Sequence, residues 1–179
     1  MKRIAVTGPA GAGKSRLARE LGDLLRIPVI HLDALYWRPG WVATPAAEWE
    51  ATQRRELAGE AWIVDAQSDD MLPDWLESAD TIIFVDASPL QCLWRVTRRR
   101  LDGPESTGVP RGSEPAPVHR ALAKFVRGQW HYRRTIRADL LAELSRTRGE
   151  RRVVVVRRPR DLRLLLAAVG SPTRAGGTV

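Results

Sequence analysis

The sequence predicts an α/β fold in which a parallel sheet of five strands carries helices on both of its faces. Five short runs of apolar residues do not alternate with polar ones, which is typical of strands buried on both sides. Segments with helical features separate these runs along the chain. A glycine-rich loop also lies between the first strand and the first helix. The length of 179 residues suits one domain with a sizeable core.

The elements can be placed in order along the chain. We expect strands at residues 3–7, 28–32, 62–65, 81–86 and 152–157. We expect helices at residues 14–26, 45–57, 69–78, 89–101, 118–146 and 160–169. Leu17, Leu21, Leu24 and Leu25 share one face of the first helix, and Thr44 is expected to cap the second helix with Pro45 at its first position.

The remaining segments are expected to lack regular structure. Residues 102–117 are rich in Gly, Pro, Ser and Glu, as loops are. We expect one domain over residues 1–169 and a disordered tail over residues 170–179.

The glycine loop carries the most specific signal in the chain. Gly8-Pro9-Ala10-Gly11-Ala12-Gly13-Lys14-Ser15 fits the pattern G-x-x-x-x-G-K-[ST], the phosphate-binding loop or P-loop. The N–H groups around Gly8, Gly11, Ala12 and Gly13 can turn inward on a polyphosphate, and the helix N-terminus adds partial positive charge. Lys14 can reach the β and γ phosphates, and the Ser15 hydroxyl can bind Mg²⁺. The sequence therefore predicts binding of ATP or GTP with Mg²⁺.

Composition limits the setting of the protein. No run of about 18 apolar residues occurs, so no membrane span is expected, and the early first strand leaves no room for a signal peptide. The single cysteine, Cys92, fits a reducing compartment and a place in the core. We therefore expect a cytoplasmic protein, either a monomer or a homodimer.

Charge is divided unevenly between the two halves. Residues 1–90 carry 9 Lys and Arg against 14 Asp and Glu, whereas residues 91–179 carry 20 against 7. The basic half could hold a polyphosphate or a nucleic acid. We find no groove-reading motif in it, so a DNA-associated ATPase or DNA-binding protein is the less favoured alternative.

Two groups of arginines flank the loop at residues 102–117. Arg95, Arg98, Arg99 and Arg100 precede it, and Arg127, Arg133, Arg134 and Arg137 follow it. Trp130, Arg133, Arg134 and Arg137 have the spacing of one helix face. We interpret residues 99–133 as a lid over the nucleotide, with Arg99 and Arg134 as catalytic cations on the triphosphate and Arg137 beside them. The alternative is a solvated basic surface.

Carboxylates follow the second, third and fourth predicted strands, whose ends should meet at one edge of the sheet. Asp33 could accept a proton from an acceptor hydroxyl or help to hold Mg²⁺ through water; it could otherwise be a cap or an ion pair. His31 is interpreted chiefly as structural, although it lies on the acceptor side. Asp65 is a candidate Mg²⁺ ligand, and Asp86 is a weaker one.

An aromatic cluster follows Asp33. Tyr36, Trp37 and Trp41 are either a stacking platform for the acceptor or the cover of a local core. Gln67 and Asp69 follow Asp65 and complete the predicted acceptor side.

Four motifs together resemble the adenylate-kinase-related "DNA topology modulation protein" family of P-loop kinases. They are the glycine loop, His31-Leu32-Asp33-x-Leu35-x-Trp37-x-Pro39-Gly40-Trp41, Leu93-Trp94-Arg95 and Trp130-x-x-Arg133-Arg134. The resemblance spans about residues 3–167 and implies the nucleoside-monophosphate-kinase fold, with three layers and strand order 2-3-1-4-5. The lid of adenylate kinases begins Arg-x-x-x-Arg, which implies an adenine contact for Arg95 and a phosphate contact for Arg99. Similarity to shikimate kinases implies that Pro159 packs on adenine and that Asp33 faces the acceptor.

One segment departs from the family pattern. The third strand is followed by Asp65-Ala66-Gln67-Ser68-Asp69-Asp70, where members of the family tend to have Asp-Gly-Asn-Tyr and a basic residue. Acidic residues repel a phosphate-bearing acceptor and suit a neutral or cationic one. We therefore predict a kinase for a small-molecule hydroxyl, such as that of a sugar or a nucleoside-type antibiotic, with a nucleoside monophosphate kinase as the alternative.

Overall fold

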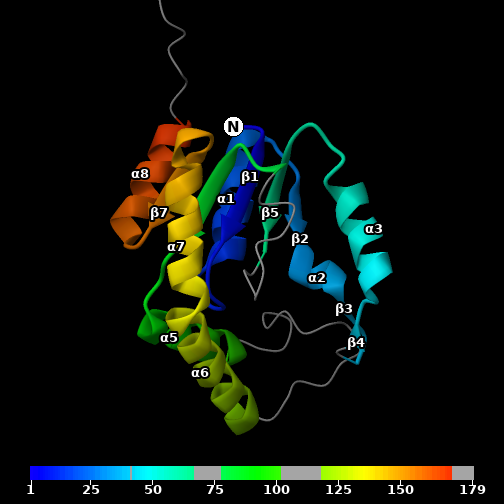
Figure 1. Cartoon of the computed structure of the whole chain (residues 1–179). Coiled ribbons are helices and arrows are strands. Elements are labelled where there is room, and N and C mark those ends of the chain that lie inside the picture. Colours follow the sequence, from blue (N-terminus) through cyan, green and yellow to red (C-terminus); the bar gives the residue numbers. More distant parts are fainter. Residues whose placement is uncertain (41, 67–77, 102–117, 171–179) are drawn as a thin grey trace, which may run out of the picture.

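The computed structural model describes residues 1–40, 42–66, 78–101 and 118–170 (Figure 1). The predictions for Trp41, Gln67, Asp69, the loop at residues 102–117, most of the helix at residues 69–78 and the tail after Gly170 lie outside these residues. Within the part that is described, no helix combines the length and apolar character that a bilayer crossing requires.

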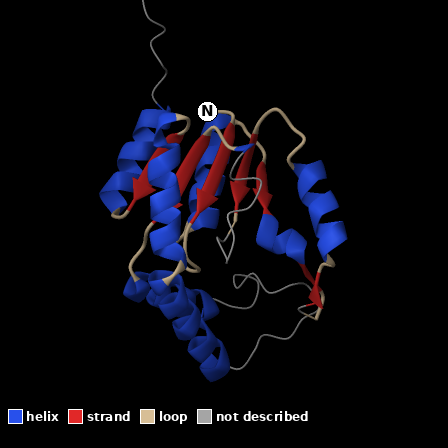
Figure 2. Ribbon diagram, viewed as in Figure 1, coloured by secondary structure: helices blue, strands red, loops and turns tan. Residues whose placement is uncertain are grey.

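A five-stranded parallel sheet forms the centre of the molecule (Figure 2). Its strands are β1 (Arg3–Thr7), β2 (Val29–His31), β5 (Trp62–Asp65), β6 (Thr81–Val85) and β7 (Arg152–Val156). They lie in the order β2-β5-β1-β6-β7. Counted among the sheet strands alone, this is the predicted order 2-3-1-4-5. The labels differ because a small hairpin, which the sequence analysis did not predict, intervenes between β2 and β5.

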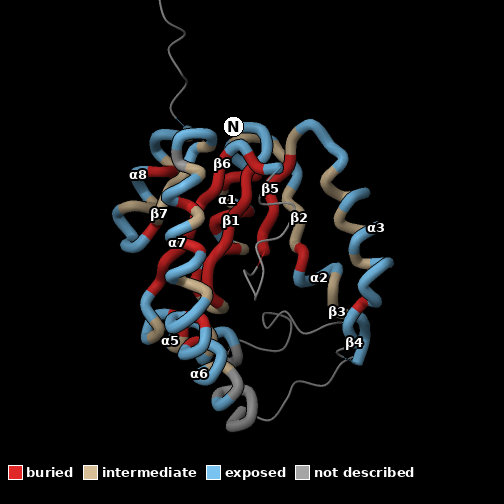
Figure 3. The backbone as a smooth tube through the Cα atoms, in the orientation of Figure 1, coloured by how far each residue is buried: buried red, intermediate tan, exposed pale blue. Residues whose placement is uncertain are grey.

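Helices cover both faces of the sheet, as predicted. On one face, α1 (Lys14–Leu25) and α8 (Pro159–Gly170) pack on side chains of β1, β6 and β7. On the other face, α7 (Ile136–Arg146) and the flanking α3 (Ala46–Glu56) pack on alternate residues of the same sheet. The central strands are therefore buried almost throughout (Figure 3). This explains their apolar, non-alternating sequences.

The remaining described elements gather at the carboxyl end of the sheet (Figure 2). They are α2 (Leu32–Tyr36), the hairpin of β3 (Trp37–Arg38) and β4 (Val42–Ala43), α5 (Pro89–Leu101) and α6 (Val118–Arg134), while the short 3₁₀ helix η2 (Thr147–Gly149) precedes β7. The bounds of α5 agree with the prediction. The second strand is shorter than expected, because Leu32 already begins α2.

The predicted cap of the second long helix was wrong. α3 begins at Ala46, with Pro45 in the cap position and no side-chain cap hydrogen bond. Thr44 is buried, and its hydroxyl donates instead to the carbonyl oxygen of Tyr36 at 2.7 Å. Thr44 therefore fastens the end of the hairpin to α2, a contact that local spacing could not reveal.

The single helix predicted over residues 118–146 is divided. α6 ends at Arg134 and α7 begins at Ile136, with Thr135 between them at φ −116° and ψ −73°. The hydroxyl of Thr135 donates to the carbonyl oxygen of His131 at 2.7 Å, a bond that competes with regular helix geometry. Arg137 consequently lies on a different helix from Trp130, so the predicted common face was wrong.

The first helix buries most of the predicted apolar face, with one exception. Leu21 is 0% exposed in the core, whereas Leu24 is 50% exposed. The two leucines thus provide a matched pair on one helix for measuring how much burial stabilises the fold.

We predict that Leu21→Ala lowers the free energy of unfolding by about 2–5 kcal/mol, because it removes a packed side chain and leaves a cavity. Leu24→Ala should change it by less than about 0.5 kcal/mol. Urea unfolding followed by circular dichroism measures both. Equal losses in the two variants would contradict the assigned packing of α1.

Candidate active site

The glycine loop leaves β1 in a conformation that favours glycine. Gly8, Gly11 and Gly13 have φ of +146°, +78° and +97°. A Cβ at Gly8 would lie 2.5 Å from the carbonyl oxygen of Val85, and one at Gly11 would lie 2.7 Å from that of Cys92. The loop therefore packs so tightly on the end of β6 and on α5 that larger residues do not fit.

The N-terminus of α1 opens directly onto this loop. Gly13 is the cap residue; in this fully described segment no side chain caps the helix, and its first turn carries no acid. The first-turn N–H groups of an α-helix have no carbonyl partner within the helix, and the positive end of the helix dipole lies beside the loop. These features fit a phosphate group. The N–H of Ala12, which was predicted to turn inward on phosphate, instead donates to the carbonyl oxygen of Pro9 at 3.1 Å.

Lys14 is folded over the loop. The residue is 7% exposed, and its Nζ donates to the carbonyl oxygen of Pro9 at 3.2 Å. Ser15 follows it in a half-buried position at the start of α1. The predicted phosphate-binding residues are therefore brought together at one place.

Two side chains from the arginine-rich part of the chain contact the loop backbone. Arg95 of α5 donates from Nη1 to the carbonyl oxygen of Ala12 at 2.5 Å. Gln129 of α6 donates from Nε2 to the carbonyl oxygen of Ala10 at 2.9 Å. The sequence analysis missed Gln129, because one glutamine among arginines has no distinguishing spacing.

Two other arginines were predicted to act as cations of the lid. Arg99 and Arg134 are both exposed. The guanidinium of Arg134 lies over the ring of Trp130, 4.3 Å from its centre, and Trp130 itself is 62% exposed. This is a cation–π pair on the surface of α6.

Arg137, which we predicted to contact the nucleotide, is paired with Asp86. Its Nε and Nη2 donate to the two carboxylate oxygens of Asp86 at 2.8 and 2.7 Å. Arg157, after β7, adds a third bond at 3.2 Å. Burial raises the pKa of the Asp86 carboxyl, but the hydrogen bonds and charges of the two arginines outweigh it, so this pKa lies below its usual value. The cluster ties α7 and β7 to the end of β6.

On the acceptor side, His31 and Asp65 form a hydrogen-bonded pair. His31 Nδ1 lies 2.8 Å from Oδ2 of Asp65. Because a carboxylate can only accept, Nδ1 carries the hydrogen in this contact. Asp65 is buried at the end of β5, and Asp33 lies exposed in the first turn of α2. Register pairs His31 with Asp65 across adjacent strands, which accounts for their meeting.

The aromatic residues after Asp33 pack on one another. Tyr36 meets Trp37 edge to face with ring centres 4.9 Å apart, and meets Trp49 of α3 at 5.2 Å. For Tyr36 and Trp37 this arrangement favours the local-core interpretation over a free stacking platform. Trp49 completes the cluster and was not predicted.

Pro159 begins α8 directly after the β7 loop and is exposed. Asp161 accepts hydrogen bonds from the N–H groups of Arg158 and Arg157, which lower the pKa of its carboxyl and cap this helix. The structure thus places Pro159 at the carboxyl edge of the sheet, on the β7 side.

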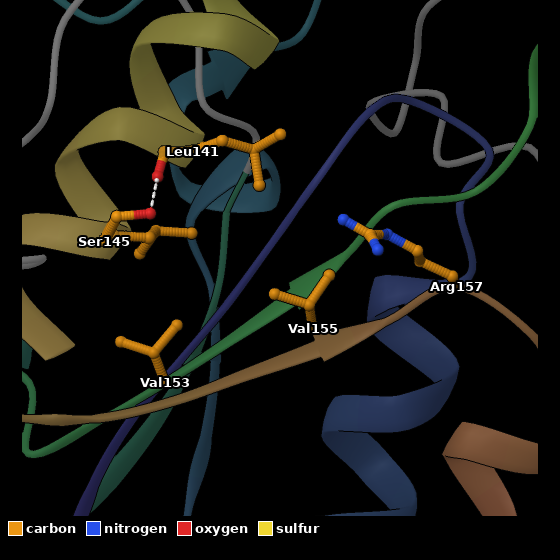
Figure 4. Close-up of a pocket in the computed structure, with 6 residues that line it drawn as sticks. Leu141, Ser145, Val153, Val155 and Arg157 are labelled. Atoms are coloured by element: carbon orange, nitrogen blue, oxygen red, sulfur yellow. Dashed lines mark hydrogen bonds between the residues drawn. The ribbon is translucent and has the colours of Figure 1, made fainter.

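A cavity of about 270 Å³ lies between α7 and β7 (Figure 4). Val153 and Val155 of β7 face Leu141 and Ser145 of α7 across it, and Arg157 stands at its end (Figure 4). It opens beside the Asp86 cluster rather than at the glycine loop. None of the predicted site residues lines it.

Comparison with solved structures identifies similar folds. A sugar kinase from Janibacter sp. is 13% identical, with a TM-score of 0.51, over 96% of this chain and 99% of that one. The shikimate kinase of Bacteroides thetaiotaomicron is 16% identical, with a TM-score of 0.51, over 94% and 96%. The shikimate kinase of Acinetobacter baumannii, in complex with shikimate, is 17% identical, with a TM-score of 0.54, over 94% and 90%. No family model and no curated protein sequence matches the chain.

These likenesses and the glycine loop define the class of fold. The chain has the P-loop kinase fold, with a parallel sheet between helical layers and the phosphate loop at the carboxyl end of the central strand.

We predict that Asp86→Asn lowers the free energy of unfolding by about 2 kcal/mol at pH 7, the scale of hydrogen bonds to charged groups. The folded-state pKa of Asp86 is depressed, so its stabilisation is complete above the unfolded value of about 3.9 and is lost as pH falls through the folded value. We expect the difference in free energy of unfolding between wild type and variant to become smaller in acid. Urea unfolding at pH 7 and below pH 4 measures this difference.

The exposed Asp139 of α7 offers a control for this measurement. Asp139→Asn should leave stability nearly unchanged at pH 7. If Asp86→Asn lowers the free energy of unfolding by the same amount at pH 7 and below pH 4, the ion-pair assignment is contradicted.

Proposed function

We propose that this protein is a kinase that transfers the γ-phosphoryl group of ATP or GTP to a hydroxyl of a small molecule. The observation that carries the proposal is the loop itself. Three glycines at positive φ, a helix N-terminus without a side-chain cap and the ammonium of Lys14 lie together at this loop, and such a combination suits an anion. The solved relatives in fold, a sugar kinase and two shikimate kinases, support a small-molecule acceptor by analogy.

In this proposal each group of the loop has a role. The N–H groups and Lys14 hold the β and γ phosphates and stabilise charge on the transferred group. Mg²⁺, when bound, neutralises phosphate charge. The Ser15 hydroxyl would hold it, and Asp65, which has one carboxylate oxygen engaged by His31, would offer the other to a water of the ion. Arg99, at the start of a lid over about residues 99–133, and Arg134, directly after it, would add further cations.

Asp33 would orient or deprotonate the acceptor hydroxyl. It is exposed at the end of β2, on the same edge of the sheet as the loop. Asp65 lies on the neighbouring strand, and the sequence continues to Asp69 and Asp70. This concentration of acids favours a neutral or cationic acceptor. Our preferred acceptor is a nucleoside-type antibiotic or a sugar, which would suit a self-resistance or tailoring enzyme.

The resemblance to the "DNA topology modulation protein" family belongs to this proposal as well. It rests on the four motifs given above, which are the glycine loop and those that begin at His31, Leu93 and Trp130. We propose no DNA-binding role from it. A cytoplasmic kinase acting as a single domain is the form that we propose.

We predict that a coupled assay of ADP and GDP release across sugars, nucleosides, nucleoside monophosphates and antibiotics identifies a hydroxyl acceptor. Lys14→Ala should lower turnover of that acceptor by at least about 10²-fold, because it removes a cation from the developing phosphate charge. Lys2→Ala, at an exposed lysine before β1, is the matched control and should be as active as wild type.

The panel also separates the alternatives. Transfer to nucleoside monophosphates alone would favour the nucleoside monophosphate kinase over our proposal. Turnover that survives Lys14→Ala unchanged would exclude a kinase that uses this loop.

We predict that Asp33→Asn lowers kcat by about 10²–10⁴-fold, the usual scale for loss of a general base, and leaves the KM for ATP unchanged. Steady-state kinetics with the identified acceptor measure both constants. Asp23→Asn, at an exposed aspartate of α1, is the control. Full activity of Asp33→Asn would refute the role assigned to Asp33.

A further inference from the structure

Two carbonyl oxygens of the glycine loop accept hydrogen bonds from side chains of two helices that are distant in sequence. Gln129 of α6 lies 119 residues after Ala10, whose carbonyl oxygen accepts its amide hydrogen at 2.9 Å. Arg95 of α5 makes the equivalent contact to Ala12. Gln129 is 7% exposed, so its amide group is withdrawn from water and committed to this place.

A hydrogen bond to one carbonyl group also sets the direction of the N–H group of the next residue, because the two belong to one rigid peptide. In a planar trans peptide the C=O of one residue and the N–H of the next point in opposite directions. With the Ala10 carbonyl directed at Gln129, the N–H of Gly11 points away from Gln129. The contact of Arg95 with Ala12 fixes the N–H of Gly13 by the same geometry.

The conformation of Gly11 makes this control necessary. Glycine at φ +78° has no Cβ to restrict it and populates several alternative conformations at little cost. A Cβ at Gly11 would lie 2.7 Å from the carbonyl oxygen of Cys92 and 2.9 Å from Val96, so Gly11 packs closely on α5. The N–H of Ala12 donates to the carbonyl oxygen of Pro9 at 3.1 Å and closes the turn, but neither contact involves the Ala10–Gly11 peptide itself. A directional hydrogen bond supplies the missing restraint.

We infer that Gln129 is a positioning residue for triphosphate binding, acting through the Ala10–Gly11 peptide. This inference rests on the proposed function, because it assumes that the loop binds a polyphosphate. Gln129 does not touch the phosphates; it sets the direction of an N–H group that does. Phosphate binding in this chain thereby depends on the position of α6.

Loss of this donor should weaken binding of the phosphate chain in particular. Gln129→Met keeps the length of the side chain and removes its hydrogen-bond donor. We expect inorganic tripolyphosphate and ATP to bind about three- to tenfold more weakly to this variant, the scale of one lost hydrogen bond. The KM for ATP should rise by the same factor, while kcat and the KM for the acceptor stay near wild type.

Isothermal titration calorimetry with inorganic tripolyphosphate, and then with ATP, measures the effect on the full chain. Gln53→Met is the matched control, because Gln53 lies on α3 and the chemical change is identical. Gln129→Leu is the second variant; it is uncharged and cannot donate to Ala10, so it should also weaken binding. Circular dichroism establishes that each variant is folded, and if Gln129→Met is not, Gln129→Leu decides.

The outcomes distinguish a failure of the role inferred for Gln129 from a failure of the proposed kinase function. Wild-type affinity in a folded variant at position 129, or an equal loss in Gln53→Met, would overturn the inference. A rise in the KM for the acceptor to the same degree as that for ATP would also overturn it. Lys14→Ala, titrated in parallel, tests the loop itself; unchanged tripolyphosphate binding in that variant would remove the proposed function and with it the inference. Weaker binding in Lys14→Ala, together with wild-type affinity in the variants at position 129, would overturn the inference alone.

Discussion

The pairing of β1 with β5 on one side and β6 on the other is the constraint on which the site depends. All three strands are parallel and buried, so their carboxyl ends reach the same edge. The register sets Val6 beside Asp65 and Thr7 beside Phe84, two residues before Asp86. A glycine loop that leaves β1 must therefore emerge between two carboxylates, in the crevice where parallel sheets bind ligands.

The carboxylates of Asp86 and Asp65, at the carboxyl edge of the sheet, have different partners. Asp86 binds Arg137 and Arg157 and so fastens α7 and β7 to the end of β6. Asp65 pairs with His31 on the acceptor side. The Asp86 cluster joins α7 and the end of β7 to β6, whereas the His31–Asp65 pair joins two neighbouring strands, β2 and β5. The glycine loop lies between them and is held from behind by α5 and α6.

Sequence reasoning succeeded where local pattern and topology agree. The five strands and the glycine loop follow from apolar runs and from one motif, whereas the strand order was implied by the family resemblance. Sequence reasoning was wrong where the position of a side chain depends on tertiary contacts or on a local break in a helix. Thr44 was expected to cap a helix but bonds to Tyr36, and Arg137 was expected on the face of Trp130 but lies beyond a break at Thr135. The first case depends on a hydrogen bond to a residue eight positions away, and the second on backbone dihedrals at Thr135 that helical spacing does not encode.

By itself, the sequence determined the parallel α/β core and the place of the phosphate loop, because burial on both faces and a need for glycine leave direct marks in residue type. Only the tertiary structure decided which side chains serve that loop. Gln129 and Arg95 reach it from helices after β6, and their choice depends on how α5 and α6 pack behind the loop. Such contacts carry no periodicity, since hydrogen bonds to a backbone carbonyl require only a donor at the right point in space.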